Sequence, residues 1–157
     1  QTGGGSGRVK TRKKSGLART PPYAHANVRS GAAGKKSFET RNGIKVIMTR
    51  ERKHRMDARS TGIEKDDPEY YNLVVDYAMR LTWSGEFLHA APWSAASHGS
   101  ANVSHGCTGM SMANAKWLYD HSTIGDVVEY KGGRRPLEWG NGITVWNRSF
   151  ADWSAGS

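Results

Sequence analysis

The most constraining stretch of the chain is residues 71–89, which is typical of two β-strands joined by a tight turn. In the first half the side chains alternate in character from one position to the next. One face would carry Tyr77, Met79, Leu81 and Trp83. Alternation with a period of two predicts a half-buried strand. Ser84-Gly85 then forms a turn, and residues 86–89 return as a second strand. The chain must therefore contain a hairpin that ends at His89.

Two further strands are predicted at residues 44–48, after the Asn42-Gly43 turn signal, and at residues 127–130. Residues 50–59 are charged and predict an irregular segment. We therefore expect a mainly β domain.

A single helix is predicted to start at Ser111, whose hydroxyl can cap the first turn, and to run to about His121. Its apolar positions would pack against the sheet. The remaining C-terminal tail is mostly irregular and contains Trp139, Trp146 and Trp153. We expect this tail to fold back on the sheet.

Positive charge is concentrated in the first part of the chain, although the net charge of +9 belongs to the whole. Residues 1–60 hold 16 Lys and Arg against 3 acids, whereas residues 61–157 hold 7 against 11. Residues 1–22 are Gly-rich and poor in large apolar side chains, which predicts a basic linker or disordered tail. We place the folded domain at residues 23–157. The rest of the charge asymmetry indicates either a solvated arm or a contact with a polyanion, and we favour the arm.

The chemistry of the chain points to Cys107, the only cysteine, in the run Ser104-His105-Gly106-Cys107. A lone cysteine is usually a small buried hydrophobe. Here it lies in a Gly- and Ser-rich stretch, residues 97–109, which predicts a loop. His89 lies 18 positions upstream, and an imidazole can generate the reactive thiolate. A nucleophile and base pair is therefore the leading hypothesis.

A family resemblance is carried by three motifs, in order along the chain. They are His89-Ala90-Ala91-Pro92-Trp93, Ser104-His105-Gly106-Cys107, and Ser111 followed by Asn114-Ala115-Lys116-Trp117. In these motifs, over roughly residues 34–157, the chain resembles the L,D-transpeptidase (YkuD-like) family, mycobacterial type. The resemblance implies a β-sandwich-like fold with one helix after the cysteine loop.

The activity that the resemblance implies is the formation of 3→3 crosslinks in peptidoglycan. The cysteine would take an acyl group from a tetrapeptide stem and pass it to a diaminopimelate side-chain amine of an acceptor stem. Carbapenems would acylate the same cysteine. The family further implies a monomer with no cofactor, no metal and no nucleic-acid partner. It implies an exported enzyme of the periplasm or cell wall, anchored to the membrane through a segment absent from these 157 residues.

The resemblance also implies residue roles. Cys107 is the nucleophile and His89 the base, oriented by the backbone carbonyl of Ala90, where the family often has serine. His105 helps to shape the oxyanion region, and the oxyanion donors are the N–H groups of Cys107 and Gly106 and the hydroxyl of Tyr71. The implied substrate-binding residues are Ser84, Gly85, Trp93, Ser104, Gly109, His54 and Met56.

One position departs from the family pattern. Gly109 stands where the family usually carries Asn two residues after the cysteine. Glycine cannot donate or accept through a side chain, and it loosens the backbone. We therefore expect a more mobile cysteine loop and slower acylation, which Gly109→Asn would reverse.

Four alternatives stay open at this point. The first is an L,D-carboxypeptidase of the same fold, with water as acceptor. The second is a non-enzymatic binder of anionic polymer through the basic N-terminal region. A papain-like hydrolase is disfavoured, since there the cysteine precedes the histidine. A zinc site would need ligands from the set His89, His98, His105, Cys107 and His121, which has no compact ligand spacing.

Overall fold

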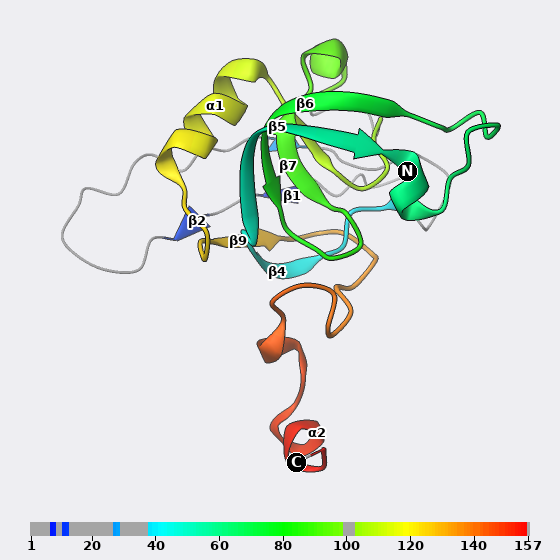
Figure 1. Cartoon of the computed structure of the whole chain (residues 1–157). Helices are drawn as coiled ribbons and strands as arrows, with labels where there is room; N and C mark the ends of the chain where they lie inside the picture. The colour runs from blue at the N-terminus through cyan, green and yellow to red at the C-terminus, as the bar shows by residue number, and fades with distance from the viewer. Residues whose placement is uncertain (1–6, 9–10, 13–26, 29–37, 99–102, 157) are drawn as a thin grey trace, which may run out of the picture.

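The protein is described by a computed structural model that covers residues 7–8, 11–12, 27–28, 38–98 and 103–156. Its elements follow one another along the chain as short strands, 3-10 turns and two helices (Figure 1). The strands are β1 Gly7–Arg8, β2 Thr11–Arg12, β3 Asn27–Val28, β4 Gly43–Val46, β5 Thr49–Asp57, β6 Asn72–Arg80, β7 Phe87–Ala90, β8 Thr108–Met110 and β9 Val127–Tyr130. The helices are α1 Met112–His121 and α2 Phe150–Ser154, and the 3-10 turns are η2 Ala58–Thr61, η3 Pro92–Ser97 and η4 Val145–Asn147.

The strands form a four-stranded sheet in the order β5-β6-β7-β8, a three-stranded sheet in the order β2-β9-β4, and a β1-β3 pair. All pairings are antiparallel except β7 with β8, which run parallel. A mainly β, sandwich-like domain is therefore confirmed, and the segment that follows Cys107 joins the four-stranded sheet as strand β8.

One hydrophobic core joins the two larger sheets to α1. It contains Ile47, Met79, Leu81, Leu88, Ala90, Met110, Ala115, Leu118, Val128 and Tyr130, all of them buried. The helix packs against β6 and β7 through its Ala115 and Leu118 face. The predicted start of the helix is confirmed, because the Ser111 side chain accepts a hydrogen bond from the Asn114 N–H.

A second, smaller cluster includes the cysteine. Its members are Met56, Val75, Ala78, Phe87 and Cys107, with Tyr71 and Leu73 packed against them. Residues of β6 and β7 contribute to both clusters, so the middle of the four-stranded sheet is buried on both faces.

The predicted hairpin is confirmed, with Met79 opposite Leu88 and Arg80 opposite Phe87, but its alternation is not uniform. Tyr77 adopts a positive φ of 56°, a conformation that costs energy for a residue with a Cβ, and Trp83 is exposed. Ala78 and Met79 are both buried although they are adjacent. The simple one-face interpretation of this strand is therefore wrong beyond Tyr77.

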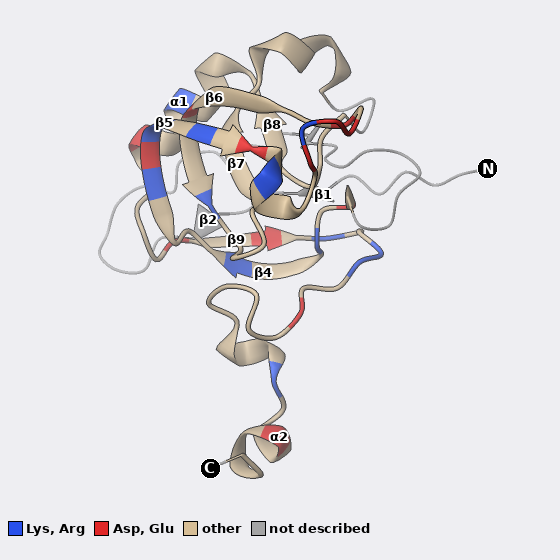
Figure 2. Ribbon diagram, turned by 45° about the vertical axis from the view of Figure 1, so that its right-hand side comes forward, with Lys and Arg blue, Asp and Glu red and all other residues tan. Residues whose placement is uncertain are grey.

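Two segments that the sequence predicts to be irregular form strands in the structure. Residues 50–59 were expected to lack regular structure, yet most of them form β5, which pairs along its length with β6. Basic and acidic residues intermingle along this edge strand (Figure 2). None of its charged side chains is buried. Charged side chains are common on edge strands, where they block pairing with other chains. Similarly, Thr108 and Gly109, the last two residues of the predicted loop, lie in strand β8.

The chain ends are less regular. The C-terminal tail touches the smaller sheet through Trp146, whose Nε1 donates to the Ile44 carbonyl at 3.2 Å, and Leu137, whose N–H donates to the Asn42 carbonyl at 2.9 Å. Beyond Trp146 it extends away, so that α2 lies apart from both sheets (Figure 1). The expectation that the whole tail folds back is therefore wrong for its last part.

At the other end, β2 pairs with β9, whereas most of residues 1–37 lie outside the described part of the chain. The predicted boundary between residues 22 and 23 stays a prediction. Among the described residues, none of the helices has the length and apolar character needed to span a membrane.

Candidate active site

A cavity of about 210 Å³ opens over the four-stranded sheet and brings most of the predicted residues together. Eight of its lining residues were predicted from the sequence: Met56, Tyr71, His89, Trp93, Ser104, His105, Cys107 and Gly109. The register explains the meeting of Cys107 and His89. Gly109 is opposite His89 in the parallel β7–β8 pair, and side chains two residues apart on a strand share a face. Cys107 therefore faces the same side as His89.

The thiol of Cys107 is buried and protonated at rest. Burial raises its pKa to about 11, with a smaller contribution from the Glu86 carboxylate, while a backbone hydrogen bond from Phe87 opposes the shift. The Sγ–H donates to the Gly85 carbonyl at 3.5 Å. The thiolate thus has to be formed during the reaction, by removal of this proton.

His89 is arranged to remove a proton. Its Nδ1 lies 2.8 Å from the Ala90 carbonyl oxygen, which can only accept a hydrogen bond, so Nδ1 carries the hydrogen. Nε2 is then left as the acceptor. Burial lowers the pKa of His89, which keeps the ring neutral and able to act as a base. The predicted orienting role of the residue 90 carbonyl is consistent with this contact.

His105 and Tyr71 form one wall of the cavity. The His105 ring contacts Phe38 edge-on, with ring centroids 4.5 Å apart, and its centroid lies 5.1 Å from that of Tyr71. Its Nε2 is 3.8 Å from a Glu69 carboxylate oxygen. Burial raises the pKa of the Tyr71 phenol, so its hydroxyl keeps its proton and can donate a hydrogen bond. These positions fit a polar wall beside the thiol.

Gly109 lies in β8, and its role differs from the expected loosening of a loop. A Cβ built at this position would come 2.9 Å from the Ala91 Cβ and 3.5 Å from His98 Nε2. Gly109 has no positive φ, so the glycine is required by close packing and not by backbone conformation. An Asn side chain at this position would have to displace Ala91, so the faster acylation expected of Gly109→Asn stays a prediction that this packing opposes.

Five predicted residues do not line the cavity. Gly85 and Ala90 act through their carbonyls, as described, and Gly106 lies behind the cysteine with a φ of +106°. Ser84 belongs to the hairpin turn, where the Asn141 amide donates to its Oγ at 3.0 Å. His54 lies on β5, where its Nδ1 is 2.8 Å from Glu51 Oε2 and its ring stacks on that of Phe87. The proposed substrate contacts of Ser84 and His54 stay predictions.

The cavity also contains residues that the sequence did not single out for it: Leu73, Ala91, Ser94, His98 and Val103. His98 is the notable one, because its Nε2 lies 3.2 Å from the Ser94 hydroxyl and the ring covers Gly109. The only signal for it is the Ser97-His98-Gly99 triplet, which repeats the pattern before Cys107. Its place depends on the 3-10 turn η3, which local sequence does not indicate.

The alternative of a zinc site finds no ligand cluster in the part of the chain that the structure describes. There, no group of three or more His, Cys, Asp or Glu side chains is arranged to hold a metal ion. His121, one of the candidate ligands, stacks on Trp117 at the end of α1 instead of lining the cavity.

Comparison with known proteins places this arrangement in a family. The family model of the L,D-transpeptidase catalytic domain (YkuD) matches residues 8–129. L,D-transpeptidase 2 of Mycobacterium tuberculosis is 39% identical over 127 residues, which are 79% of this chain and 31% of that protein. The chain thus spans about a third of the length of this relative.

Two solved structures are similar to this protein. L,D-transpeptidase 3 from Mycobacterium tuberculosis, in complex with a faropenem-derived adduct, is 35% identical with a TM-score of 0.58, covering 75% of this chain and 49% of that one. The LD transpeptidase LdtMt1 in complex with imipenem is 45% identical with a TM-score of 0.59, covering 64% and 46%. With the cysteine, the histidine and the sheet arranged as described, the chain belongs to the L,D-transpeptidase catalytic domain family.

Proposed function

We propose that this domain is a peptidoglycan L,D-transpeptidase that forms 3→3 crosslinks through a thioester on Cys107. The observation that carries the proposal is the single cavity lined by both Cys107 and a neutral, oriented His89. Family membership supports it, since relatives named L,D-transpeptidases carry the same domain.

The first half-reaction is acylation. His89 Nε2 accepts the Cys107 proton as Sγ attacks the carbonyl carbon before the last residue of the tetrapeptide stem. The negative charge that develops on the carbonyl oxygen is stabilised by the Cys107 and Gly106 N–H groups and the Tyr71 hydroxyl. The C–N bond breaks, and the leaving amine takes the proton from His89.

The second half-reaction is transfer. The diaminopimelate side-chain amine of an acceptor stem attacks the thioester carbonyl while His89 accepts one of its protons. The C–S bond breaks, a new amide forms, and the proton returns to Sγ. A β-lactam would stop the cycle after the first half-reaction, because ring opening leaves its amine tethered to the acyl group.

The direct test is intact-mass spectrometry of the protein after incubation with a carbapenem. We expect one adduct per chain on the wild type and none on Cys107→Ala or Cys107→Ser. His89→Ala should slow acylation by about 10²- to 10⁴-fold, the usual contribution of a general base. An adduct on Cys107→Ala would refute the assignment of the nucleophile.

A second measurement separates crosslinking from hydrolysis. Incubation with tetrapeptide stems and chromatography of the products should give dimers and release of the terminal residue. A carboxypeptidase would give tripeptides alone, because water would replace the amine. Tripeptides without dimers would therefore favour the alternative activity while leaving the thioester intact.

A further inference from the structure

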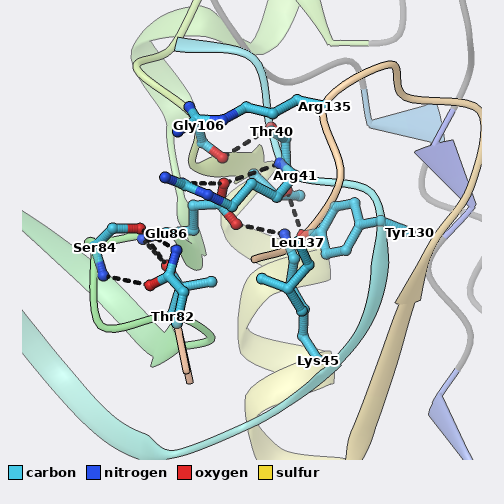
Figure 3. Close-up of polar contacts among 12 residues, drawn as sticks. Thr40, Arg41, Lys45, Thr82, Ser84, Glu86, Gly106, Tyr130, Arg135 and Leu137 are labelled. Atoms are coloured by element: carbon cyan, nitrogen blue, oxygen red, sulfur yellow. Dashed lines mark hydrogen bonds and ion pairs between the residues drawn. The ribbon is translucent and has the colours of Figure 1, made fainter. Parts of the chain in front are cut away.

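Gly106 and Cys107 share a peptide group that is held from behind by Thr40. The buried Thr40 hydroxyl donates to the Gly106 carbonyl oxygen at 2.8 Å, as Figure 3 shows. The described residues contain no cis peptide bonds, so the N–H of this peptide points away from its carbonyl. The Thr40 bond therefore fixes the direction of the Cys107 N–H. It also polarises the peptide, which makes that N–H a stronger donor.

Thr40 is itself held by a cluster of charged side chains. Glu86 has a side chain only 4% exposed, and its Oε1 accepts from the Arg41 backbone N–H at 2.9 Å and from Arg41 Nη1 at 3.0 Å. Its Oε2 accepts from Lys45 Nζ, whose side chain is fully buried. Because Arg41 follows Thr40 directly, the bond to its backbone N–H pins the segment that presents the Thr40 hydroxyl (Figure 3).

The same glutamate also touches the cysteine loop and the hairpin. A Cβ added to Gly106 would lie 3.6 Å from Glu86 Cγ, so the loop packs directly on this side chain. The Glu86 N–H donates to the Thr82 hydroxyl at 2.9 Å, and its carbonyl accepts from the Leu81 N–H at 2.8 Å. Glu86 is therefore fixed at both its backbone and its carboxylate, between Gly85 and strand β7.

Such a cluster is a costly way to stabilise a fold. Desolvation of buried charges offsets much of their attraction, and apolar replacements of a buried ion pair are often neutral or stabilising. The three charged side chains next to the cysteine loop are better explained by the positions that their hydrogen bonds fix. An oxyanion donor requires an N–H group that is held in a fixed direction.

We propose that Thr40, held in place by the cluster of Glu86, Arg41 and Lys45, is a positioning residue for the oxyanion donor of this enzyme. Its hydroxyl fixes the Gly106–Cys107 peptide so that the Cys107 N–H meets the negative charge of the acyl-transfer transition state. The proposal rests on the acyl-transfer function proposed above.

The test compares two reactions of the same thiol. Acylation by a carbapenem develops an oxyanion, whereas alkylation by iodoacetamide displaces iodide and develops none. Thr40→Val removes the hydroxyl at nearly constant volume, and Thr40→Ser keeps it. We expect Thr40→Val to acylate about 10- to 100-fold more slowly, with an unchanged noncovalent affinity and an unchanged alkylation rate. Thr40→Ser should acylate within a few fold of the wild type.

A second pair of variants tests whether the charged cluster holds Thr40 in the position that its bond to Gly106 requires. Lys45→Met with Glu86→Gln removes both charges but keeps an amide oxygen for the Arg41 N–H, whereas Lys45→Met with Glu86→Leu removes the acceptor. Selective loss of acylation in the Leu variant alone supports the positioning role. Equal acylation in Thr40→Val and the wild type would overturn it, as would parallel losses of acylation and alkylation. A wild type that is alkylated but never acylated by the carbapenem would overturn the proposed function as well.

Discussion

At the scale of single residues, the reactive pair is neutral at rest. Burial raises the pKa of the Cys107 thiol and lowers that of His89, so neither group is charged near pH 7. In cysteine enzymes that keep a thiolate–imidazolium pair, the thiol pKa is depressed instead. A neutral pair implies that proton transfer accompanies attack on the substrate.

The pH dependence of alkylation tests this resting state. As pH rises toward the pKa of about 11, the thiolate fraction of Cys107 grows, so its alkylation rate by iodoacetamide should climb continuously from pH 7. Each unit of pH below the pKa should change the rate about tenfold. The modified protein is counted by intact mass at each pH, with Cys107→Ser as the blank. A rate that is already level between pH 6 and 8 would contradict the neutral pair.

Gly109 provides the second prediction at this scale. Because an added Cβ would meet the Ala91 Cβ at 2.9 Å, Gly109→Ala should destabilise the protein by about 1–3 kcal/mol through overpacking. The double variant Gly109→Ala with Ala91→Gly removes the clashing methyl group and should recover most of the loss. Urea unfolding of the wild type, of these two variants and of Ala91→Gly alone measures this recovery. Two losses that simply add would show that these side chains do not meet.

At the scale of elements, local signals predicted what is local. The Asn42-Gly43 turn, the Ser84-Gly85 turn and the Ser111 cap placed β4, the β6–β7 hairpin and α1 within a few residues. Strand β5 was missed because its charged residues mask the pattern of a strand, and because its pairing partners on β6 lie 15 to 31 positions away in sequence. Pairing of distant segments is specified by the fold and not by composition.

The same distinction applies to the active site. The motif identified His89, which lies on β7, and Cys107, which directly precedes β8, and family resemblance named most of the cavity wall. Thr40, Lys45 and Glu86 could not be found, because their contacts join segments 41 to 66 positions apart. His98 enters the cavity only through the shape of η3, which the alternation of residue types does not encode.

The helix cap yields a prediction for this scale. Ser111 lies between the end of β8 and the start of α1. Its Oγ accepts a hydrogen bond from the Asn114 N–H at 3.2 Å and thereby caps the helix. Ser111→Ala should therefore lower the free energy of unfolding by about 1 kcal/mol, and Ser111→Asp, also a good cap, should preserve it. Because Ser111 does not line the cavity, alkylation of Cys107 should be unchanged in both variants. Equal unfolding midpoints for all three proteins would show that the cap contributes nothing.

At the scale of the whole molecule, the reactive cavity and the N-terminal strand belong to different sheets. Cys107 and His89 are placed by β7 and β8, whereas β2 pairs with β9 at the edge of the three-stranded sheet. The two sheets meet in the shared core, where Val128 of β9 is fully buried. Loss of the β2–β9 pairing should therefore lower the free energy of unfolding but leave the surroundings of the Cys107 thiol unchanged.

Truncation tests this separation. Deletion of residues 1–22 removes β1 and β2, which leaves β3 without its partner and β9 with an unpaired edge beside Val127 and Val128. Each pairing of two residues contributes on the order of 1 kcal/mol, so the loss of both should lower the melting temperature by about 4–8 °C. Deletion of residues 1–6 keeps β2 and begins before the family match, which makes it the matched control. Both truncated proteins should alkylate at the wild-type rate at 25 °C. Loss of thiol reactivity in the longer deletion would place the N-terminal segment inside the catalytic fold and move the domain boundary upstream of residue 22.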